Sequence, residues 1–274
     1  GVQPAAFAAP STLAELQDVV RGARGCVRIM GSAHSFNRAI DPGEGGTLLS
    51  LSHLRWVNEP CGATRTVRVG GGATYDDVVQ RLHGTGLALA NTAALPQVTV
   101  AGAVATGTHG SSGVDRATGR AKLGSLSSAV SALEFVLADG SELRLARGED
   151  ARFEGAVVSM GCLGAVSALT LDLVLDYDVE QVVYGAWPLD EGVHGVGDRG
   201  GQHWPACAIV ESLDEVLASC DSFSAFVIGR TCAPACWCCA RSCRPAQAGA
   251  AGAAVPVPVA VAVAASASDS CTRR

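Results

Sequence analysis

The stretch "VTVAGAVATGTHGSSG", residues 98–113, joins small apolar residues to a run of glycines, threonines and serines around one histidine. Its apolar half, which includes Val98, Val100 and Val104, favours burial. Its polar half is rich in hydrogen-bond donors, and burial of such donors is costly unless a polar ligand meets them. An exposed flexible loop is the alternative. We favour ligand contact, because an exposed loop leaves the valines and alanines without a role.

Two further stretches are also built from small residues, namely "RIMGSAHSFN" (28–37) and "SMGCLGAV" (159–166). In the first, strand-like residues lead into the turn Gly31-Ser32-Ala33, which His34 follows. Small residues allow backbone N–H groups to converge on an anion. The stretch matches neither the GxxxxGK[ST] nor the GxGxxG phosphate-binding pattern. A plain β-turn with His34 in solvent is therefore the alternative.

The remaining pattern predicts an α+β fold, because helices and strands interleave without a regular βαβ alternation. Helices are predicted over 11–24, with Thr12 and Glu15 as a capping box, from Tyr75 to Gly84 or Gly86, and around 151–159. Short strands are predicted over 26–30, 47–51 and 66–70. Residues 131–147 predict a hairpin with a two-residue type I′ turn at Asp139-Gly140. A long strand is predicted to follow the turn at 159–166.

Taken together and in this order, the three small-residue stretches resemble the FAD-binding domain of the vanillyl-alcohol oxidase superfamily, also called the PCMH type. Within that superfamily they are most similar to the alditol (xylitol) oxidases and the sugar-1,4-lactone oxidases. The resemblance covers about residues 5 to 190. It implies a two-subdomain fold, FAD as cofactor, and oxidation of a CH–OH group with oxygen as electron acceptor.

The resemblance also implies which residues contact FAD. The turn through 29–35 would hold the pyrophosphate, and His34 matches the histidine that relatives bond covalently to the 8α-methyl group of the flavin. His109 matches a second contact stretch, although it could equally be satisfied by its own loop. Ala94 stands where alditol oxidases carry a serine against flavin and substrate. The full set of expected cofactor-binding residues is Ile29, Met30, Gly31, Ser32, Ala33, His34, Ser35, Ala94, Thr99, Gly102, Thr106, Gly107, Thr108, His109 and Val166.

Three sections of chain are expected: the FAD-binding domain over 1–190, the remnant of the start of a substrate domain over 191–227, and an irregular tail over 228–274. The tail begins with the cysteine-rich run "CAPACWCCARSC" (232–243), for which zinc binding is an alternative to sequence without a folding constraint. It continues with the uncharged stretch "AAGAAVPVPVAVAVAASAS" (250–268). A disordered low-complexity tail is favoured there over a membrane span.

The composition limits the partners. The net charge is −6 and aromatic residues make up 5% of the chain, which argues against a nucleic-acid surface. No signal peptide is visible, and five cysteines are scattered singly, so the cytoplasm is the favoured compartment. The sequence identifies no catalytic residue and no metal site. The expected activity is that of an alditol or aldonolactone oxidase. The alternative is a non-catalytic FAD-binding fragment or an aberrant gene product.

Overall fold

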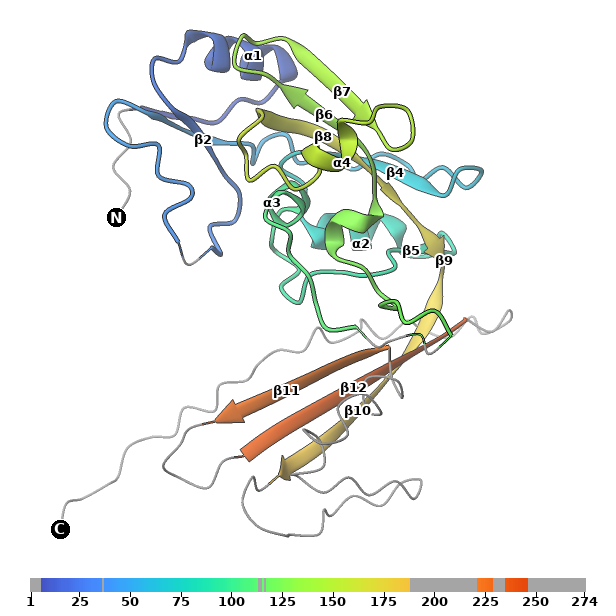
Figure 1. Ribbon diagram of the computed structural model, residues 1–274. Helices are drawn as coiled ribbons and strands as arrows, with labels where there is room; N and C mark the ends of the chain where they lie inside the picture. The colour runs from blue at the N-terminus through green and yellow to red at the C-terminus, as the bar shows by residue number, and fades with distance from the viewer. Residues whose placement is uncertain are drawn as a thin grey trace, which may run out of the picture.

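The computed structural model describes residues 6–35, 37–112, 115, 117–187, 221–228 and 235–245. Its helices are α1 (Leu13–Gly22), α2 (Tyr75–Leu82), α3 (Val100–Ala105) and α4 (Phe153–Ala156), with a 3-10 turn, η1, at Leu126–Ala129. These elements and the strands form two packed subdomains and one further sheet (Figure 1).

The longer helices begin where the sequence supplies a capping side chain. The Thr12 hydroxyl accepts a hydrogen bond from the Glu15 backbone N–H at 3.1 Å, and α1 follows directly. At α2, Thr74 and Asp77 form a reciprocal capping box. The chain leaves α2 through Gly84, whose φ of +75° suits a glycine. The helices expected over 11–24 and from Tyr75 are confirmed.

The first subdomain is a parallel sheet with the strand order β1 (Ala6–Ala8), β3 (Thr47–Ser50) and β2 (Val27–Met30). Helix α1 packs its buried face against this sheet. The core beneath α1 is formed by Leu16, Val20, Leu49, Leu51 and Leu54, together with Val136 and Ala165 from the antiparallel sheet described next. The predicted strands at 26–30 and 47–51 are therefore present, and they lie side by side.

The second subdomain is an antiparallel sheet with the strand order β4 (Thr66–Gly70), β8 (Ala165–Asp172), β6 (Val130–Val136) and β7 (Glu142–Ala146). Helices α2 and α3 bury Val78, Val100 and Val104 in a separate core with Phe135 and Leu169 of the sheet. A short pair, β5 (Leu87–Ala88) and β9 (Val174–Leu175), lies at one end. The two separate cores confirm the expected α+β fold with two subdomains.

The turn between β6 and β7 differs from the predicted type I′ turn. The Gly140 N–H donates to the Leu137 carbonyl, and the Leu137 N–H donates to the Ser141 carbonyl. Gly140 has a φ of +80°, whereas Asp139 is not among the residues with positive φ. The loop is therefore a three-residue turn with a glycine bulge. The Asp139 carboxylate accepts hydrogen bonds from the Ser141 N–H and hydroxyl, which stabilise this alternative.

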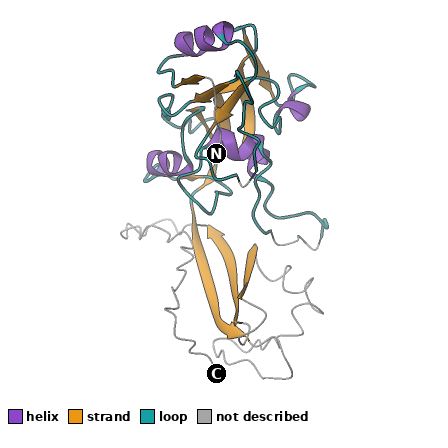
Figure 2. Ribbon diagram, turned by 90° about the vertical axis from the view of Figure 1, so that its left-hand side faces the viewer, coloured by secondary structure: helices purple, strands orange, loops and turns teal. Residues whose placement is uncertain are grey.

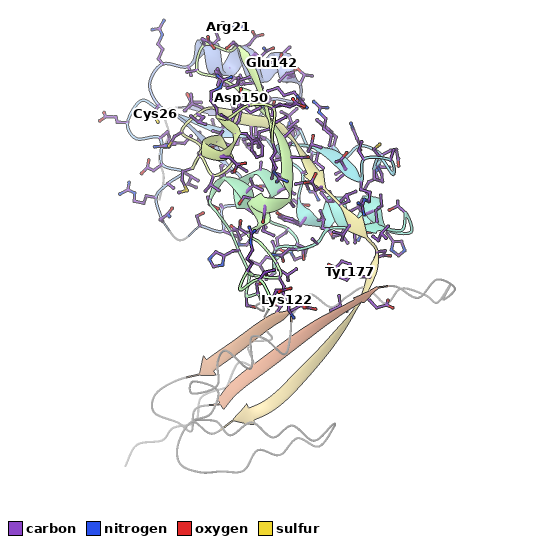
Figure 3. The ribbon with its side chains drawn as sticks, turned by 45° about the vertical axis from the view of Figure 1, so that its right-hand side comes forward. Arg21, Cys26, Lys122, Glu142, Asp150 and Tyr177 are labelled. Atoms are coloured by element: carbon purple, nitrogen blue, oxygen red, sulfur yellow. The ribbon has the colours of Figure 1, made fainter. Side chains whose placement is uncertain are left out.

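A third sheet has the strand order β10 (Tyr177–Trp187), β12 (Ala235–Pro245) and β11 (Ser222–Ile228). Figure 2 shows the described helices grouped around the first two sheets, away from this one. It joins them where Tyr177 donates from its hydroxyl to the Leu89 carbonyl at 2.9 Å and where Lys122 contacts Asp221 at 3.0 Å (Figure 3).

Strand β12 corrects part of the expectation for the tail, because 235–245 lies inside the section predicted to be irregular. The segment has no alternating apolar pattern of its own, but pairing with strands on both sides overrides weak local preference. The side chains of the cysteine-rich run and all of 246–274 lie outside the description. Across the described part of the chain, no helix combines the length and the apolar character that a membrane crossing requires.

Candidate functional site

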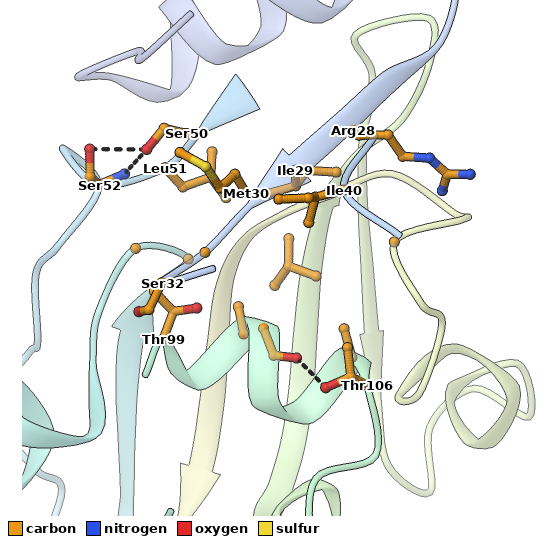
Figure 4. A pocket seen from close by; sticks show the side chains of 18 of the residues that line it. Arg28, Ile29, Met30, Ser32, Ile40, Ser50, Leu51, Ser52, Thr99 and Thr106 are labelled. Carbon is orange, nitrogen blue, oxygen red and sulfur yellow. Dashed lines mark hydrogen bonds between the residues drawn. The ribbon is translucent and has the colours of Figure 1, made fainter. Parts of the chain in front are cut away.

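A cavity of about 330 Å³ lies where residues of the two subdomains meet (Figure 4). Its size falls in the range of small-molecule sites. The lining comes from β2 with the turn that follows, residues 39–40, the end of β3 with the loop after it, the turn before α2, helix α3 with the residues at both its ends, and the loop before β8. The lining residues are Arg28–Ser32, Ser35, Ala39, Ile40, Ser50–Ser52, Arg55, Gly71, Gly72, Thr74, Gln97, Thr99, Ala101, Gly102, Ala105, Thr106, Met160, Gly161, Gly164 and Val166.

The turn after β2 packs tightly against the start of α3. A Cβ atom added at Gly31 would lie 2.4 Å from the Thr99 hydroxyl oxygen, and one added at Gly102 would lie 2.7 Å from the same atom. Both distances are far below van der Waals contact. The Ser32 hydroxyl donates to the Gln97 carbonyl at 2.7 Å and joins the same two segments. Glycine at 31 and 102 therefore lets the turn after β2 and the start of α3 pack closely around Thr99 at this side of the cavity.

Two glycines before α2 form another wall. A Cβ atom at Gly71 would lie 2.0 Å from the Val166 carbonyl oxygen, and one at Gly72 would lie 1.8 Å from the Leu51 carbonyl oxygen. Neither glycine is among the residues predicted above to contact the cofactor. The run of three glycines at 70–72 was the available signal, but the backbone segments that approach it come from distant parts of the chain.

The backbone around the cavity adopts left-handed conformations at several points. Ala33 has a φ of +56°, Met160 of +52° and Gly161 of +71°. Such conformations are unfavourable for residues other than glycine, and they cluster at functional sites. Here they occur in the two small-residue turns that the sequence singled out.

The charged groups at the cavity are arginines. The Arg55 Nε donates to the Asp77 carboxylate at 2.6 Å, and this contact raises the pKa of Arg55. Burial raises the pKa of Asp77, but the hydrogen bonds from Arg55 and Thr74 outweigh it and lower the pKa from that of a free aspartate. Arg28 is partly buried, and its Nε has no hydrogen-bond partner among the described residues. The described lining residues include no carboxylate, so the cavity suits an anion.

Nine of the fifteen expected cofactor-binding residues line the cavity, namely Ile29, Met30, Gly31, Ser32, Ser35, Thr99, Gly102, Thr106 and Val166. Ala33, Ala94, Gly107 and Thr108 lie outside the lining. His34 and His109 are exposed and do not line it either, and His109 lies with Nδ1 3.3 Å from the Gly110 carbonyl oxygen. The roles of all fifteen residues stay predictions.

These residues fit the FAD that the resemblance implies. A dinucleotide needs close backbone approach at its diphosphate, and the glycines at 31, 71, 72 and 102 let the backbone segments that line the cavity pack directly against one another, since a Cβ at any of them would meet a protein oxygen atom. A cationic group also favours a diphosphate, and Arg28 supplies one, since Arg55 is already paired with Asp77. The apolar side chains of Ile29, Met30 and Leu51 offer contact for ring systems.

Comparison with known proteins points the same way. The chain is 48% identical to an alditol oxidase from a Streptomyces species over 182 residues, which is 66% of this chain and 41% of that protein. It is 31% identical to an L-gulono-1,4-lactone dehydrogenase from Mycobacterium tuberculosis over 82% of this chain and 46% of that protein. The chain thus spans less than half the length of either relative.

Among solved structures, 6-hydroxy-D-nicotine oxidase from Arthrobacter nicotinovorans superposes with a TM-score of 0.66 at 19% identity, over 88% of this chain and 50% of that chain. This likeness concerns the fold. The family described as FAD binding domain matches residues 4–146, more than half of the 274 residues. The chain therefore belongs to the family of FAD-binding domains, and its cofactor is FAD.

Proposed function

We propose that this chain is the FAD-binding part of an oxidoreductase that oxidises a CH–OH group of a polyol or a sugar-1,4-lactone, with oxygen as electron acceptor. The observation that carries the proposal is the cavity between the two glycine-rich turns, in a chain 48% identical to an alditol oxidase over 182 residues. The second relative is named a dehydrogenase, so the acceptor has to be measured.

In this proposal the turns at 29–35 and 99–109 hold the pyrophosphate of FAD through backbone N–H groups, and Val166 meets the adenine side. His34 follows the first turn and would bond through its ring to the 8α-methyl carbon of the flavin, with loss of one methyl proton and the imidazole N–H proton; the flavin would take up the two electrons and oxygen would reoxidise it. Because His34 is exposed beside the cavity rather than in its wall, its ring is free to meet a flavin edge that projects from the mouth. Neutral imidazole is a competent nucleophile near neutral pH.

Bound FAD would supply the acceptance of a hydride from the substrate carbon and the passage of electrons to oxygen. The described lining residues bind and orient the cofactor, but they include no aspartate, glutamate or histidine. We therefore assign no base for the hydroxyl proton to them. Ala94 cannot donate or accept a hydrogen bond through its side chain, which favours a substrate contact different from that of the alditol oxidases.

The second candidate is a chain that binds FAD without turnover. The observation in its favour is that the described lining residues include no aspartate, glutamate or histidine to take the hydroxyl proton. We also propose domain boundaries at residues 190 and 227, a cytoplasmic location and no nucleic-acid partner, and we favour a disordered tail over a membrane association, on the composition given above. Fractionation of cells that express the chain tests the location.

The test is anaerobic addition of xylitol, and separately of a gulono- or galactono-1,4-lactone, to the purified FAD-loaded chain. Bleaching of the flavin absorbance, followed by recovery and release of hydrogen peroxide on admitting air, supports the oxidase. Bleaching that recovers only with an artificial electron acceptor indicates a dehydrogenase. Bound FAD that none of these substrates bleaches supports the non-catalytic candidate.

A further inference from the structure

Arg28 lines the cavity, and the proposed function gives its side chain no role. Its Nε atom is buried without a hydrogen-bond partner, and no other buried side-chain nitrogen or oxygen in the described residues is in this condition. A buried unpaired donor of this kind is costly, and most such groups in proteins have a partner. Because Nε itself is closed to solvent, a ligand in the cavity would meet the guanidinium through its terminal nitrogens, for which the described residues supply no ion pair.

The surroundings of Arg28 indicate that the partner is an anion. Arg55, the other arginine of the lining, is already paired with Asp77 at 2.6 Å. Arg28 has no comparable carboxylate contact in the described part of the chain, and no described lining residue is acidic. Its guanidinium therefore carries a positive charge that the cavity wall leaves uncompensated.

The position of Arg28 on β2 indicates which part of a bound ligand its side chain contacts. Arg28 precedes Gly31 by three residues on the strand that leads into the turn, a separation of about 10 Å at roughly 3.3 Å per residue. In Figure 4 its side chain lies at the opposite end of the group from Ser32 and Thr99. A ligand that reaches from the turn toward the loop at 160–166 would thus pass Arg28. Diphosphate is the only anionic group of FAD.

We propose that the guanidinium of Arg28 binds the diphosphate of FAD from the end of the cavity opposite the Ser32–Thr99 contact. The planar guanidinium presents paired N–H donors that match phosphate oxygens, which lysine cannot reproduce. The backbone of the Gly31 turn and Arg28 then hold the diphosphate between them. This inference rests on the proposed FAD binding and adds a charged anchor to it.

The experiment uses the full chain with His34→Ala, so that FAD stays exchangeable. Dissociation constants for FAD and for riboflavin, which lacks the diphosphate, are measured by flavin fluorescence in this parent and in Arg28→Met and Arg28→Lys. Arg24→Met is the matched control, because Arg24 is exposed just before β2 and does not line the cavity. Melting temperatures without flavin establish that each variant folds.

We expect Arg28→Met to weaken FAD binding by about tenfold to a hundredfold, since hydrogen bonds to charged groups are of that strength. Riboflavin binding should change by less than about twofold, Arg28→Lys should fall between parent and Arg28→Met, and Arg24→Met should match the parent. ADP should displace FAD from the parent better than adenosine does, and this advantage should shrink in Arg28→Met.

Unchanged FAD affinity in a folded Arg28→Met variant would overturn the inference and leave the proposed function standing. Equal losses for FAD and riboflavin, or equal losses for ADP and adenosine, would also overturn it, because they would show a structural role or stacking on adenine. Failure of the parent itself to bind FAD would remove the proposed function and, with it, the inference. If Arg28→Met does not fold, Arg28→Lys takes its place in the test. FAD and riboflavin affinities of Arg28→Lys equal to those of the parent would then overturn the diphosphate contact.

Discussion

Gly31 packs against Thr99 so closely that a single methyl group at position 31 has no room. A Cβ atom there would lie 2.4 Å from the Thr99 hydroxyl oxygen, and the next nearest atoms, Cβ and Cγ2 of Thr99, are 3.6 and 3.7 Å away. Gly31 is not among the glycines with positive φ. Alanine is therefore acceptable to the backbone, and the whole cost of Gly31→Ala comes from one atom of one neighbour.

The size of that cost follows from the geometry. Thr99 is β-branched, and its side chain has few alternative rotamers to adopt. Relief would therefore require a shift of the β2 turn or of α3, and overpacking of this kind costs about 1–3 kcal/mol. For a folded unit of this size, about 2 kcal/mol corresponds to a fall in melting temperature of roughly 4–8 °C.

The assay is a double-mutant cycle by thermal or urea unfolding with Gly31→Ala, Thr99→Ala and the double variant. Thr99→Ala removes the hydroxyl and leaves Cβ at 3.6 Å, which is ordinary contact. We expect Gly31→Ala to be nearly neutral in that background, giving a coupling energy of at least about 1 kcal/mol. Losses that add to within about 0.5 kcal/mol would refute the reasoning, since independent sites behave in that way.

Three further predictions concern other parts of the site. Ala33→Gly should raise the melting temperature by about 2 °C, because Ala33 has a φ of +56° that glycine adopts without strain; a lower value would contradict this. Asp77→Asn should flatten the loss of stability on acidification: the lowered pKa of Asp77 stabilises the fold above about pH 4, and this contribution is lost as the pH falls through the folded-state pKa. A melting temperature of Asp77→Asn that falls as steeply as that of the parent between about pH 7 and pH 3 would contradict this prediction. Acid-denatured chain should show a flavin-fluorescent band on electrophoresis that His34→Ala abolishes, whereas release of all flavin from the parent would rule out the covalent bond.

The sequence predicts the elements whose signals are local. Thr12 and Glu15 mark the start of α1, and the valines and glycines near Tyr75 mark α2, because capping and burial act within a few residues. Helix α3 was missed, since "VAGAVA" is short and combines weak helix formers with glycine. Strand β12 was missed because its stability comes from pairing with β10 and β11 rather than from its own pattern.

The candidate site likewise has parts that the sequence predicts and parts that only the fold reveals. The turn that contains Gly31 and the small-residue stretch that contains Gly102 were singled out from the sequence, because small residues next to apolar ones are visible along the chain, although Gly102 lies in α3 rather than in a loop. The wall at Gly71 and Gly72 was not, because it depends on carbonyl groups of Leu51 and Val166 that only the fold brings near. Arg28 was not predicted to contact a ligand for the same reason, because the sequence of a strand does not show which groups lie near its arginine.

Binding of FAD at the junction of the two turns is the central claim, and titration of Gly102→Glu with FAD tests it most directly. Gly102 lines the cavity beside Thr99, and a glutamate there would bring a bulky anion to the expected position of the diphosphate. Gly22→Glu is the matched control, because Gly22 ends α1 with open space around it. We predict stoichiometric FAD absorbance in the parent and in Gly22→Glu, and its loss in a folded Gly102→Glu variant. Full absorbance at stoichiometric FAD in Gly102→Glu would contradict the placement.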